Sequence, residues 1–152
     1  MDLLVFVNLL CCGIVTGTYT FEMVVVVPAT NAAPALESAK IHRALFSHLP
    51  NRFMPWLGIA GGLAAVALLL FEDDLSDTAT LLYAIGVASW VATFVILVGM
   101  SRPIDKKITE WVETSFPEAE YPETRKRWDR LMFTRGPLGL AALSLFIIAS
   151  LS

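Results

Sequence analysis

The sequence has few charged residues, few cysteines and no nucleotide-binding motif, and each shortage excludes a class of function. Only 16% of its 152 residues are charged and 56% are hydrophobic, which is outside the balance of an ordinary soluble domain. The net charge of −3 gives no basis for nucleic-acid binding. Cys11 and Cys12 are adjacent in an apolar segment, without the spacing of a redox pair or a structural zinc site, and we interpret them as packing residues. The sequence contains no phosphate-binding glycine loop, nucleophile elbow or dinucleotide fingerprint.

The sequence is rich in long hydrophobic segments. Residues 3–27 form a run of 25 residues with one ionisable side chain, Glu22. As a helix this run is about 37 Å long, enough to cross a hydrocarbon core of roughly 30 Å. Pro28 is predicted to end the helix. Residues 53–71 and 78–100 contain no charged side chain and are also long enough to span.

The last apolar segment, residues 136–151, is short for a membrane span. The stretch before it contains no helix breaker back to Pro122, which suits the first turn of a helix. One helix is therefore expected to rise from the membrane surface into the bilayer as far as Ser152. The N-terminus opens Met1-Asp2 without a basic region, so we expect the first segment to remain as a helix rather than to be cleaved as a signal peptide.

The basic residues predict how these four spans are oriented. All eleven Lys and Arg residues lie in two connections, residues 29–52 and 101–135. The remaining connection, residues 72–77, carries acidic charges only. The positive-inside rule places both basic connections in the cytoplasm and leaves the acidic turn and both termini outside. The sequence therefore predicts a multi-pass integral membrane protein, with residues 1–152 forming a single membrane domain.

Two further segments have the pattern of helices that lie on a membrane surface. Residues 35–49 interleave apolar side chains with charged ones, which favours an amphipathic helix at the cytoplasmic interface. Residues 104–112 show a similar pattern. The predicted fold is thus an all-α, integral membrane four-helix bundle with cytoplasmic interfacial helices.

Glu22 is the most informative single residue. A carboxylate inside a spanning helix costs several kcal/mol unless it is paired, protonated or in contact with water. Its place near the cytoplasmic end of the first span allows pairing with Arg52 or Arg135. A purely structural ion pair and a functional role both remain open from the sequence.

Small residues in the first two spans indicate where helices approach each other closely. Gly13 and Gly17 form a GxxxG motif in the first span, and Gly58, Gly61 and Gly62 lie in the second. Because such residues let helix backbones come together, we interpret both groups as packing positions.

The histidines and tryptophans allow two interpretations each. His42 and His48 are polar interface residues unless the fold brings one of them near Glu22, where imidazole and carboxylate would share a proton or a metal ion. We expect no cofactor, with a metal site involving Glu22, His42 or His48 as the lesser alternative. Trp111 and Trp128 are either anchors at the headgroup boundary or part of a pocket for a flat aromatic ligand.

Four short motifs together resemble one known family. They are Gly17-Thr-Tyr-Thr-Phe-Glu22 running into Val27-Pro28, Asn51-Arg-Phe-Met-Pro55, Arg102-Pro-Ile-Asp-Lys-Lys-Ile108 and Arg127-Trp-Asp-Arg-Leu-Met-Phe-Thr-Arg135. The combination is similar to the anthrone oxygenase-like family of small four-helix membrane proteins, long catalogued as a domain of unknown function. The likeness covers nearly the whole chain.

The resemblance implies an enzyme of polyketide biosynthesis. Family members of known activity are oxidoreductases that convert anthrones to anthraquinones with dioxygen, without a flavin or haem. Such a reaction needs one base, donors for an enolate oxygen and a dry, flat pocket. On this hypothesis three residues transfer protons, Glu22, Tyr19 and Asp105. The substrate is bound by five more, Arg52, Trp111, Trp128, Arg135 and His48.

The chain departs from the family pattern at two positions. It has Pro103-Ile104-Asp105 where the family usually has Pro-x-Asn, and Met132 where a His often follows the last Trp. A base supplied by that His in relatives would have to come from another group here.

A non-enzymatic alternative is also compatible with the sequence. In it the chain is a membrane subunit or scaffold whose basic connections bind anionic lipid or a partner protein. A transporter is less favoured, because four spans without an inverted repeat give little room for alternating access. The expected partners are the lipid bilayer and a hydrophobic aromatic small molecule, with homo-oligomerisation left open.

Overall fold

The computed structural model describes the chain except for residues 1, 47–49 and 74, and the side chains of residues 2 and 50–52 are also left out. The described part is helical and contains no strand. Its α-helices are α1 (Asp2–Phe21), α2 (Val27–Asn31), α3 (Ala35–Phe46), α4 (Pro50–Phe71), α5 (Asp77–Val95), α6 (Arg102–Glu113) and α7 (Tyr121–Ser150). Two π-helical turns join them, η1 (Glu22–Val26) and η2 (Ile96–Ser101).

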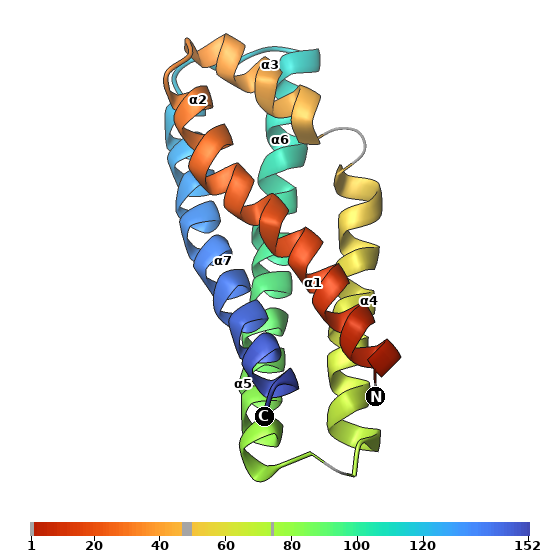
Figure 1. Cartoon of the computed structure of the whole chain (residues 1–152). Coiled ribbons are helices and arrows are strands. Elements are labelled where there is room, and N and C mark those ends of the chain that lie inside the picture. Colours follow the sequence, from red (N-terminus) through yellow and green to blue (C-terminus); the bar gives the residue numbers. More distant parts are fainter. Residues whose placement is uncertain (1, 47–49, 74) are drawn as a thin grey trace.

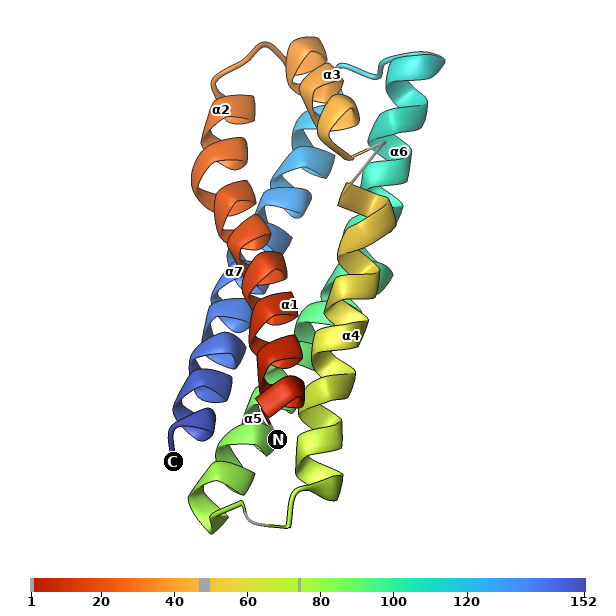
Figure 2. The same cartoon turned by 45° about the vertical axis from the view of Figure 1, so that its right-hand side comes forward.

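These elements form four long rods that lie side by side (Figures 1 and 2). The rods are α1–η1–α2, α4, α5–η2–α6 and α7. Each contains a stretch that is long and apolar enough to cross a membrane, namely Leu3–Asn31, Phe53–Phe71, Asp77–Glu113 and Tyr121–Ser150. The predicted all-α bundle with four spans is therefore confirmed, and the chain is a multi-pass integral membrane protein in contact with lipid.

The prediction that Pro28 ends the first helix is wrong, because the helix continues to Asn31. In an unbroken α-helix a proline has no N–H to donate and its ring collides with the carbonyl four residues earlier. Here the π-helical turn η1 comes first, and its wider ring is closed by the bond from Val27 N–H to Glu22 O. Pro28 then lies in the first turn of α2, where a missing N–H costs little.

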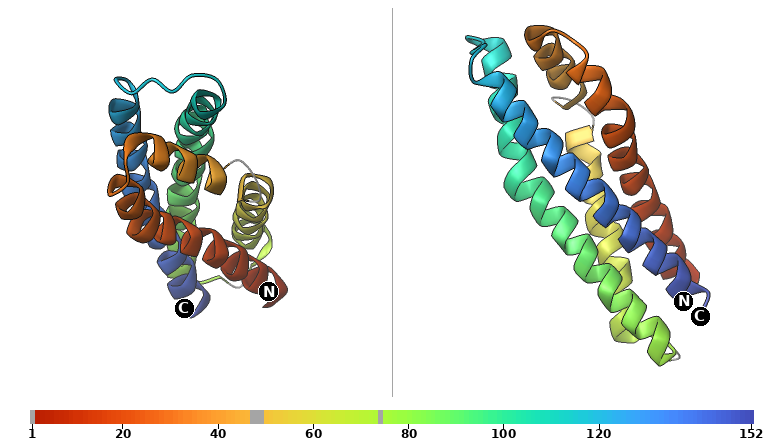
Figure 3. Two further views of the ribbon diagram at one scale, coloured as in Figure 1. Left: turned by 90° about the horizontal axis from the view of Figure 1, so that it is seen from above. Right: turned by 90° about the vertical axis from the view of Figure 1, so that its left-hand side faces the viewer.

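The predicted surface helix after the first span is present as α3, and its last predicted residues, 47–49, lie outside the described part. α3 crosses the end of the bundle that is opposite to both termini (Figure 1; Figure 3, left). The helix expected at residues 104–112 is also present, but not as a separate interfacial helix. Instead α6 continues the line of α5 through η2 (Figure 3, right). The resulting rod of 37 residues is about 55 Å long, so it extends well beyond a hydrocarbon core of roughly 30 Å.

The long C-terminal helix agrees with the sequence prediction. α7 begins at Tyr121, has proline in its first turn and runs through Pro137 to Ser150 without a break. Because α6, α7 and the first rod all extend toward α3, they enclose a second apolar core beyond the main one. This second core contains Val26, Val27, Ala39, Phe46, Ile104, Ile108, Tyr121, Trp128, Leu131 and Met132.

The first rod lies across the bundle and contacts α4 near its start and α7 farther on. Near the start, Asn8 Nδ2 donates a hydrogen bond to Gly61 O at 2.9 Å, and Cys12 is fully buried in the main core. Farther on, Thr16 Oγ1 donates to Gly139 O at 3.3 Å. The packing interpretation of Cys12 thus agrees with its position.

The glycines divide into two groups. A Cβ atom added to Gly61 would lie 2.7 Å from Cys12 Sγ and 3.2 Å from the backbone nitrogen of the same residue. Gly58 and Gly62 are similarly crowded by side chains of the third rod. In contrast, a Cβ atom at Gly13 or Gly17 would meet no atom within 4 Å. The packing prediction holds for the second span, whereas the GxxxG motif of the first makes no close contact among the described residues.

This difference gives a stability prediction. Gly61→Ala should lower the free energy of unfolding by about 1–3 kcal/mol, because α1 and α4 must separate to admit the methyl group. Gly13→Ala is the matched control, and it should be neutral or stabilise by up to about 1 kcal/mol through the higher helix propensity of alanine. Thermal unfolding in detergent measures both. Equal effects of the two substitutions would contradict the close approach at Gly61.

Candidate functional site

Buried polar residues gather at the α3 end of the bundle. The group consists of Glu22, Thr30, Ser38, His42, Ser101, Asp105, Arg125 and Arg135. Two of its members lie in the π-helical turns, Glu22 as the first residue of η1 and Ser101 as the last residue of η2. Such turns change the direction of side chains and occur frequently at functional sites. The cluster is therefore the candidate functional site.

The first part of the cluster is the ion pair between Glu22 and Arg135. Arg135 Nη2 donates to Glu22 Oε2, and only 6% of Glu22 and 2% of Arg135 is exposed. The Arg135 guanidinium also lies 4.2 Å from the centre of the Tyr19 ring, and its Nη2 is 3.1 Å from Met132 Sδ. Of the two partners predicted for Glu22, Arg135 is the one found, and the side chain of Arg52 lies outside the described part.

The second part is centred on Asp105 of α6. Trp128 Nε1 donates to Asp105 Oδ1 at 2.8 Å, and His42 Nε2 is 3.1 Å from the same oxygen. The other ring nitrogen of His42, Nδ1, is 3.3 Å from Arg125 Nη1. Burial lowers the pKa of His42 below its ordinary value, the hydrogen bond and charge of Asp105 oppose this shift, and the positive charge of Arg125 reinforces it.

Arg125 connects this part to the end of the first rod. Its Nη2 donates to Thr30 Oγ1, and its Nε lies 2.9 Å from Asp129 Oδ1. Asn31 Nδ2 donates to the other carboxylate oxygen of Asp129 at 2.9 Å. The guanidinium of Arg125 also lies over the Trp128 ring, 4.4 Å from its centre. Arg125 is thus held from several sides.

Both parts of the cluster face one small cavity. Its volume is about 20 Å³, which is room for one water molecule. The lining residues are Thr18, Tyr19, Glu22, Phe46, Met54, Pro55, Leu97, Asp105, Trp128 and Arg135. The buried hydroxyl of Tyr19 has no hydrogen-bond partner among the described residues. The three residues predicted to transfer protons, Glu22, Tyr19 and Asp105, are therefore brought together.

The predicted substrate-binding residues are not all found at the cavity. Trp128 and Arg135 line the cavity, and Trp128 is fully buried, so it is not an anchor at the headgroup boundary. Trp111 is half-buried, does not line the cavity and has Lys107 Nζ 4.6 Å from the centre of its ring. His48 lies outside the described residues, as does the side chain of Arg52. The part of the chain that the structure describes contains no group of three His, Cys, Asp or Glu side chains able to share a metal ion.

The sequence does not point to Arg125 or Thr30, and it predicts a role for His42 only if the ring lies near Glu22 and shares a proton or a metal ion with it. The prediction that Pro28 ends the first helix leaves Thr30 outside that helix. A signal for Arg125 does exist, since it lies one helical turn before Trp128 and Asp129 and shares their face of α7. Neither residue can be linked to His42 from the sequence, because 83 positions separate Arg125 from His42.

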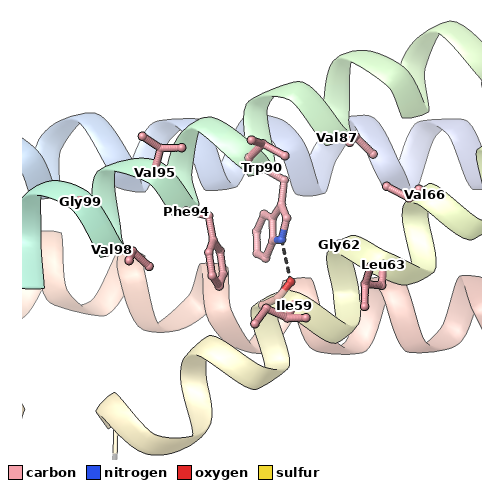
Figure 4. Close-up of a pocket in the computed structure, with 12 residues that line it drawn as sticks. Ile59, Gly62, Leu63, Val66, Val87, Trp90, Phe94, Val95, Val98 and Gly99 are labelled. Carbon is pink, nitrogen blue, oxygen red and sulfur yellow. Dashed lines mark hydrogen bonds between the residues drawn. The ribbon is translucent and has the colours of Figure 1, made fainter.

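A larger hollow lies beside the cavity, between α4 and the α5–η2 rod (Figure 4). It is an open groove of about 620 Å³ with only apolar residues and glycines in its lining. Trp90 and Phe94 form its aromatic wall, and Trp90 Nε1 donates to Gly58 O at 2.9 Å (Figure 4). One turn farther along, Met54 and Leu97 of the same two rods line the polar cavity. The groove and the cavity are therefore neighbours.

Comparisons of the chain with models of protein families, with curated proteins and with solved structures gave no significant match. The fold and the cluster themselves define the class of protein, a multi-pass α-helical membrane protein with a buried polar site at one end of its bundle.

The ion pair gives a prediction about stability. Arg135→Met leaves the Glu22 carboxylate buried without its partner and should cost about 3–5 kcal/mol of unfolding free energy. The double variant Glu22→Gln with Arg135→Met removes both charges and should recover much of this loss. Thermal unfolding in detergent measures both effects.

A matched control is the exposed pair of Lys106 and Glu110, whose nitrogen and oxygen are 3.7 Å apart. Lys106→Gln should change stability by less than about 0.5 kcal/mol, because solvent screens the pair. A double variant no more stable than Arg135→Met alone would show that the cost does not come from an unpaired charge.

Proposed function

We propose that this chain is a small-molecule membrane enzyme of the anthrone oxygenase type, which oxidises an anthrone-type polyketide or a similar flat aromatic compound with dioxygen. The observation that carries the proposal is the convergence of two buried carboxylates, Glu22 and Asp105, with Tyr19, Trp128 and Arg135 on one cavity. The sequence motifs that resemble the anthrone oxygenase-like family supply the reaction type.

The proposed reaction uses the carboxylates as bases. An anthrone loses a proton from its benzylic carbon, and the resulting carbanion passes electrons to dioxygen. One oxygen atom becomes the new carbonyl group and the other leaves as water, so the anthrone is oxidised by the reduction of O₂. The Arg135 guanidinium and the Tyr19 hydroxyl are suited to stabilise the enolate oxygen, because donors in a water-poor site act more strongly than in water.

The groove provides a route for such a substrate. An anthrone dissolves in the bilayer, and a volume of about 620 Å³ lies within the range of small-molecule pockets, roughly 300–1,000 Å³. The side chains of Met54 and Leu97, which border the polar cavity, have to move for the ring system to reach Glu22. Methionine adapts easily to such changes because its side chain is unbranched and flexible.

One observation favours the non-enzymatic alternative, a membrane subunit or scaffold. The cavity holds about one water molecule, and Glu22 and Arg135 already neutralise each other. In this alternative the cluster only joins α3 to the bundle, and the basic end of the protein binds anionic lipid or a partner. Activity measurements distinguish the two functions.

Substituting Glu22 tests the proposed enzyme. The purified protein in lipid nanodiscs should form anthraquinone from anthrone and dioxygen faster than the uncatalysed background. Glu22→Gln should lower this rate about 100-fold or more, the usual range for losing a general base. Lys106→Gln, on an exposed residue, is the control and should leave the rate unchanged.

Two outcomes count against the proposal. A parental protein without oxygen-dependent turnover would favour the scaffold. A correctly inserted Glu22→Gln protein with the parental rate would remove Glu22 from the mechanism.

We also propose that both termini and the acidic turn lie outside and that the basic connections lie in the cytoplasm. Both termini and the α4–α5 turn lie at one end of the bundle, and α3 and the α6–α7 connection lie at the other (Figure 1). The basic residues Lys40, Arg43, Lys106 and Lys107 are all on the α3 end, which supports this orientation through the positive-inside rule.

Cysteine labelling in intact cells tests the orientation. Asp73→Cys, in the exposed acidic turn, should react with an impermeant thiol reagent from outside, whereas Lys107→Cys should be protected until the membrane is opened. Both native cysteines are buried, so they should contribute little background. Labelling of position 107 but not of position 73 would reverse the assigned orientation.

A further inference from the structure

The contacts of His42 determine which of its ring nitrogens carries the proton. Arg125 Nη1 lies 3.3 Å from His42 Nδ1, and a guanidinium has hydrogen-bond donors but no acceptor. Nδ1 must therefore be the accepting nitrogen. In a neutral imidazole one nitrogen accepts and the other donates, so the proton lies on Nε2. This nitrogen is 3.1 Å from Asp105 Oδ1, and it donates to that oxygen.

We propose that Arg125 holds His42 in the neutral form with its proton on Nε2, and that His42 in this form is a positioning residue for Asp105. The positioning role rests on the proposed function, in which Asp105 faces the reacting substrate. The assignment of the proton rests on geometry alone.

Each other state of His42 creates a repulsive contact. The opposite tautomer would place an N–H against the N–H of Arg125 and a lone pair against the carboxylate of Asp105. The doubly protonated ring would keep the bond to Asp105 but would place a positive charge and an N–H against the guanidinium. The ionisable groups that face the ring from other elements are Asp105 of α6 and Arg125 and Asp129 of α7. On its own helix, Lys40 and Arg43 point to the exposed side.

Packing also restricts the position of the ring. His42 is fully buried, and its ring centre lies 4.7 Å from that of Phe46 and 4.9 Å from that of Trp128. Arg125 is itself held by Thr30 and Asp129. The positions of donor, imidazole and carboxylate are thus set before any substrate binds, which is what a preorganised site requires.

For Asp105 the consequence is a fixed orientation of its carboxylate. Two N–H groups, from His42 and Trp128, donate to Oδ1. Among the described contacts both donors reach the same oxygen, so the lone pairs of Oδ2 are left to accept a proton. His42 does not line the cavity, and it therefore acts through Asp105 rather than on the substrate.

Nitrogen NMR tests the assigned proton directly. In protein labelled with ¹⁵N-histidine in lipid bilayers, the His42 spectrum should show a protonated Nε2 and an unprotonated Nδ1. His42→Gln assigns the signals, because the chain has two histidines. The neutral form should persist below pH 6.5, the ordinary pKa of histidine, since burial lowers the pKa of His42. A signal from protonated Nδ1 at neutral pH would overturn the proposal, whatever the activity of the protein.

Variants of Arg125 show whether its side chain determines the tautomer of His42. Arg125→Met removes the donor to Nδ1, so the two tautomers should become mixed and the pKa of His42 should rise. Arg125→Lys keeps a cationic donor and should keep the proton on Nε2, which covers the case that Arg125→Met fails to fold. Lys126→Met, at the exposed next position, is the control and should leave the spectrum unchanged. If Arg125→Met folds and leaves the His42 spectrum unchanged, Arg125 does not determine the tautomer.

The positioning role has a separate measurement. In His42→Leu the Asp105 carboxylate loses one of its two N–H donors and with it part of its fixed orientation. We expect kcat to fall roughly 100-fold, as for other small misplacements of a reacting group, with KM nearly unchanged because His42 does not line the cavity. His42→Gln retains an N–H donor and should recover much of the rate. A folded His42→Leu protein with the parental kcat, or a His42→Gln protein as slow as His42→Leu, would remove the positioning role.

The two proposals can fail separately. If the NMR spectrum shows the assigned tautomer but no anthrone is oxidised, the proposed function fails and the assignment of the proton stands. If turnover is found with a protonated Nδ1, the inference about His42 fails and the proposed function stands.

Discussion

Charged groups buried at the end of an apolar bundle must find partners inside the protein, and this requirement organises the α3 end of the molecule. A carboxylate at such a place is strongly destabilising by itself. Glu22 is matched by Arg135, and Asp105 is matched by the N–H groups of Trp128 and His42. The partners come from different rods and from α3, so each pairing also fixes how these elements lie against one another. The same contacts therefore compensate the buried charges and hold the end of the bundle together.

The two π-helical turns place these side chains where they can pair. The π-helical turn η1 begins at Glu22 and precedes Pro28. The helix therefore continues beyond the proline, and Thr30 lies next to Arg125. The turn η2 lies just before Asp105 in the third rod. A π-helical turn inserts an extra residue and rotates everything after it around the helix axis. Without these turns the side chains that follow would point in other directions.

The polar cavity and the apolar groove differ in what the proposed function asks of each. The cavity is lined by carboxylates but has room for only one water molecule, whereas the groove has the volume of a ligand pocket but only apolar residues and glycines in its lining. They lie one helical turn apart along α4 and the third rod. This arrangement suits a substrate that is mostly flat hydrocarbon with one reactive end. The same small cavity is also what a purely structural cluster would leave.

The sequence by itself determined the number and approximate position of the spans, because a hydrocarbon core accepts only long uncharged segments. It also indicated that Glu22 needs a partner and that Arg135 was one of two choices. What the tertiary structure alone decided is the rest of the cluster. Asp105 is 63 positions from His42 and Arg125 is 95 positions from Thr30, and no local pattern connects them. Their pairing depends on the rotation of each rod about its axis, which the π-helical turns change, and on side-chain packing, which sets the volumes of cavity and groove.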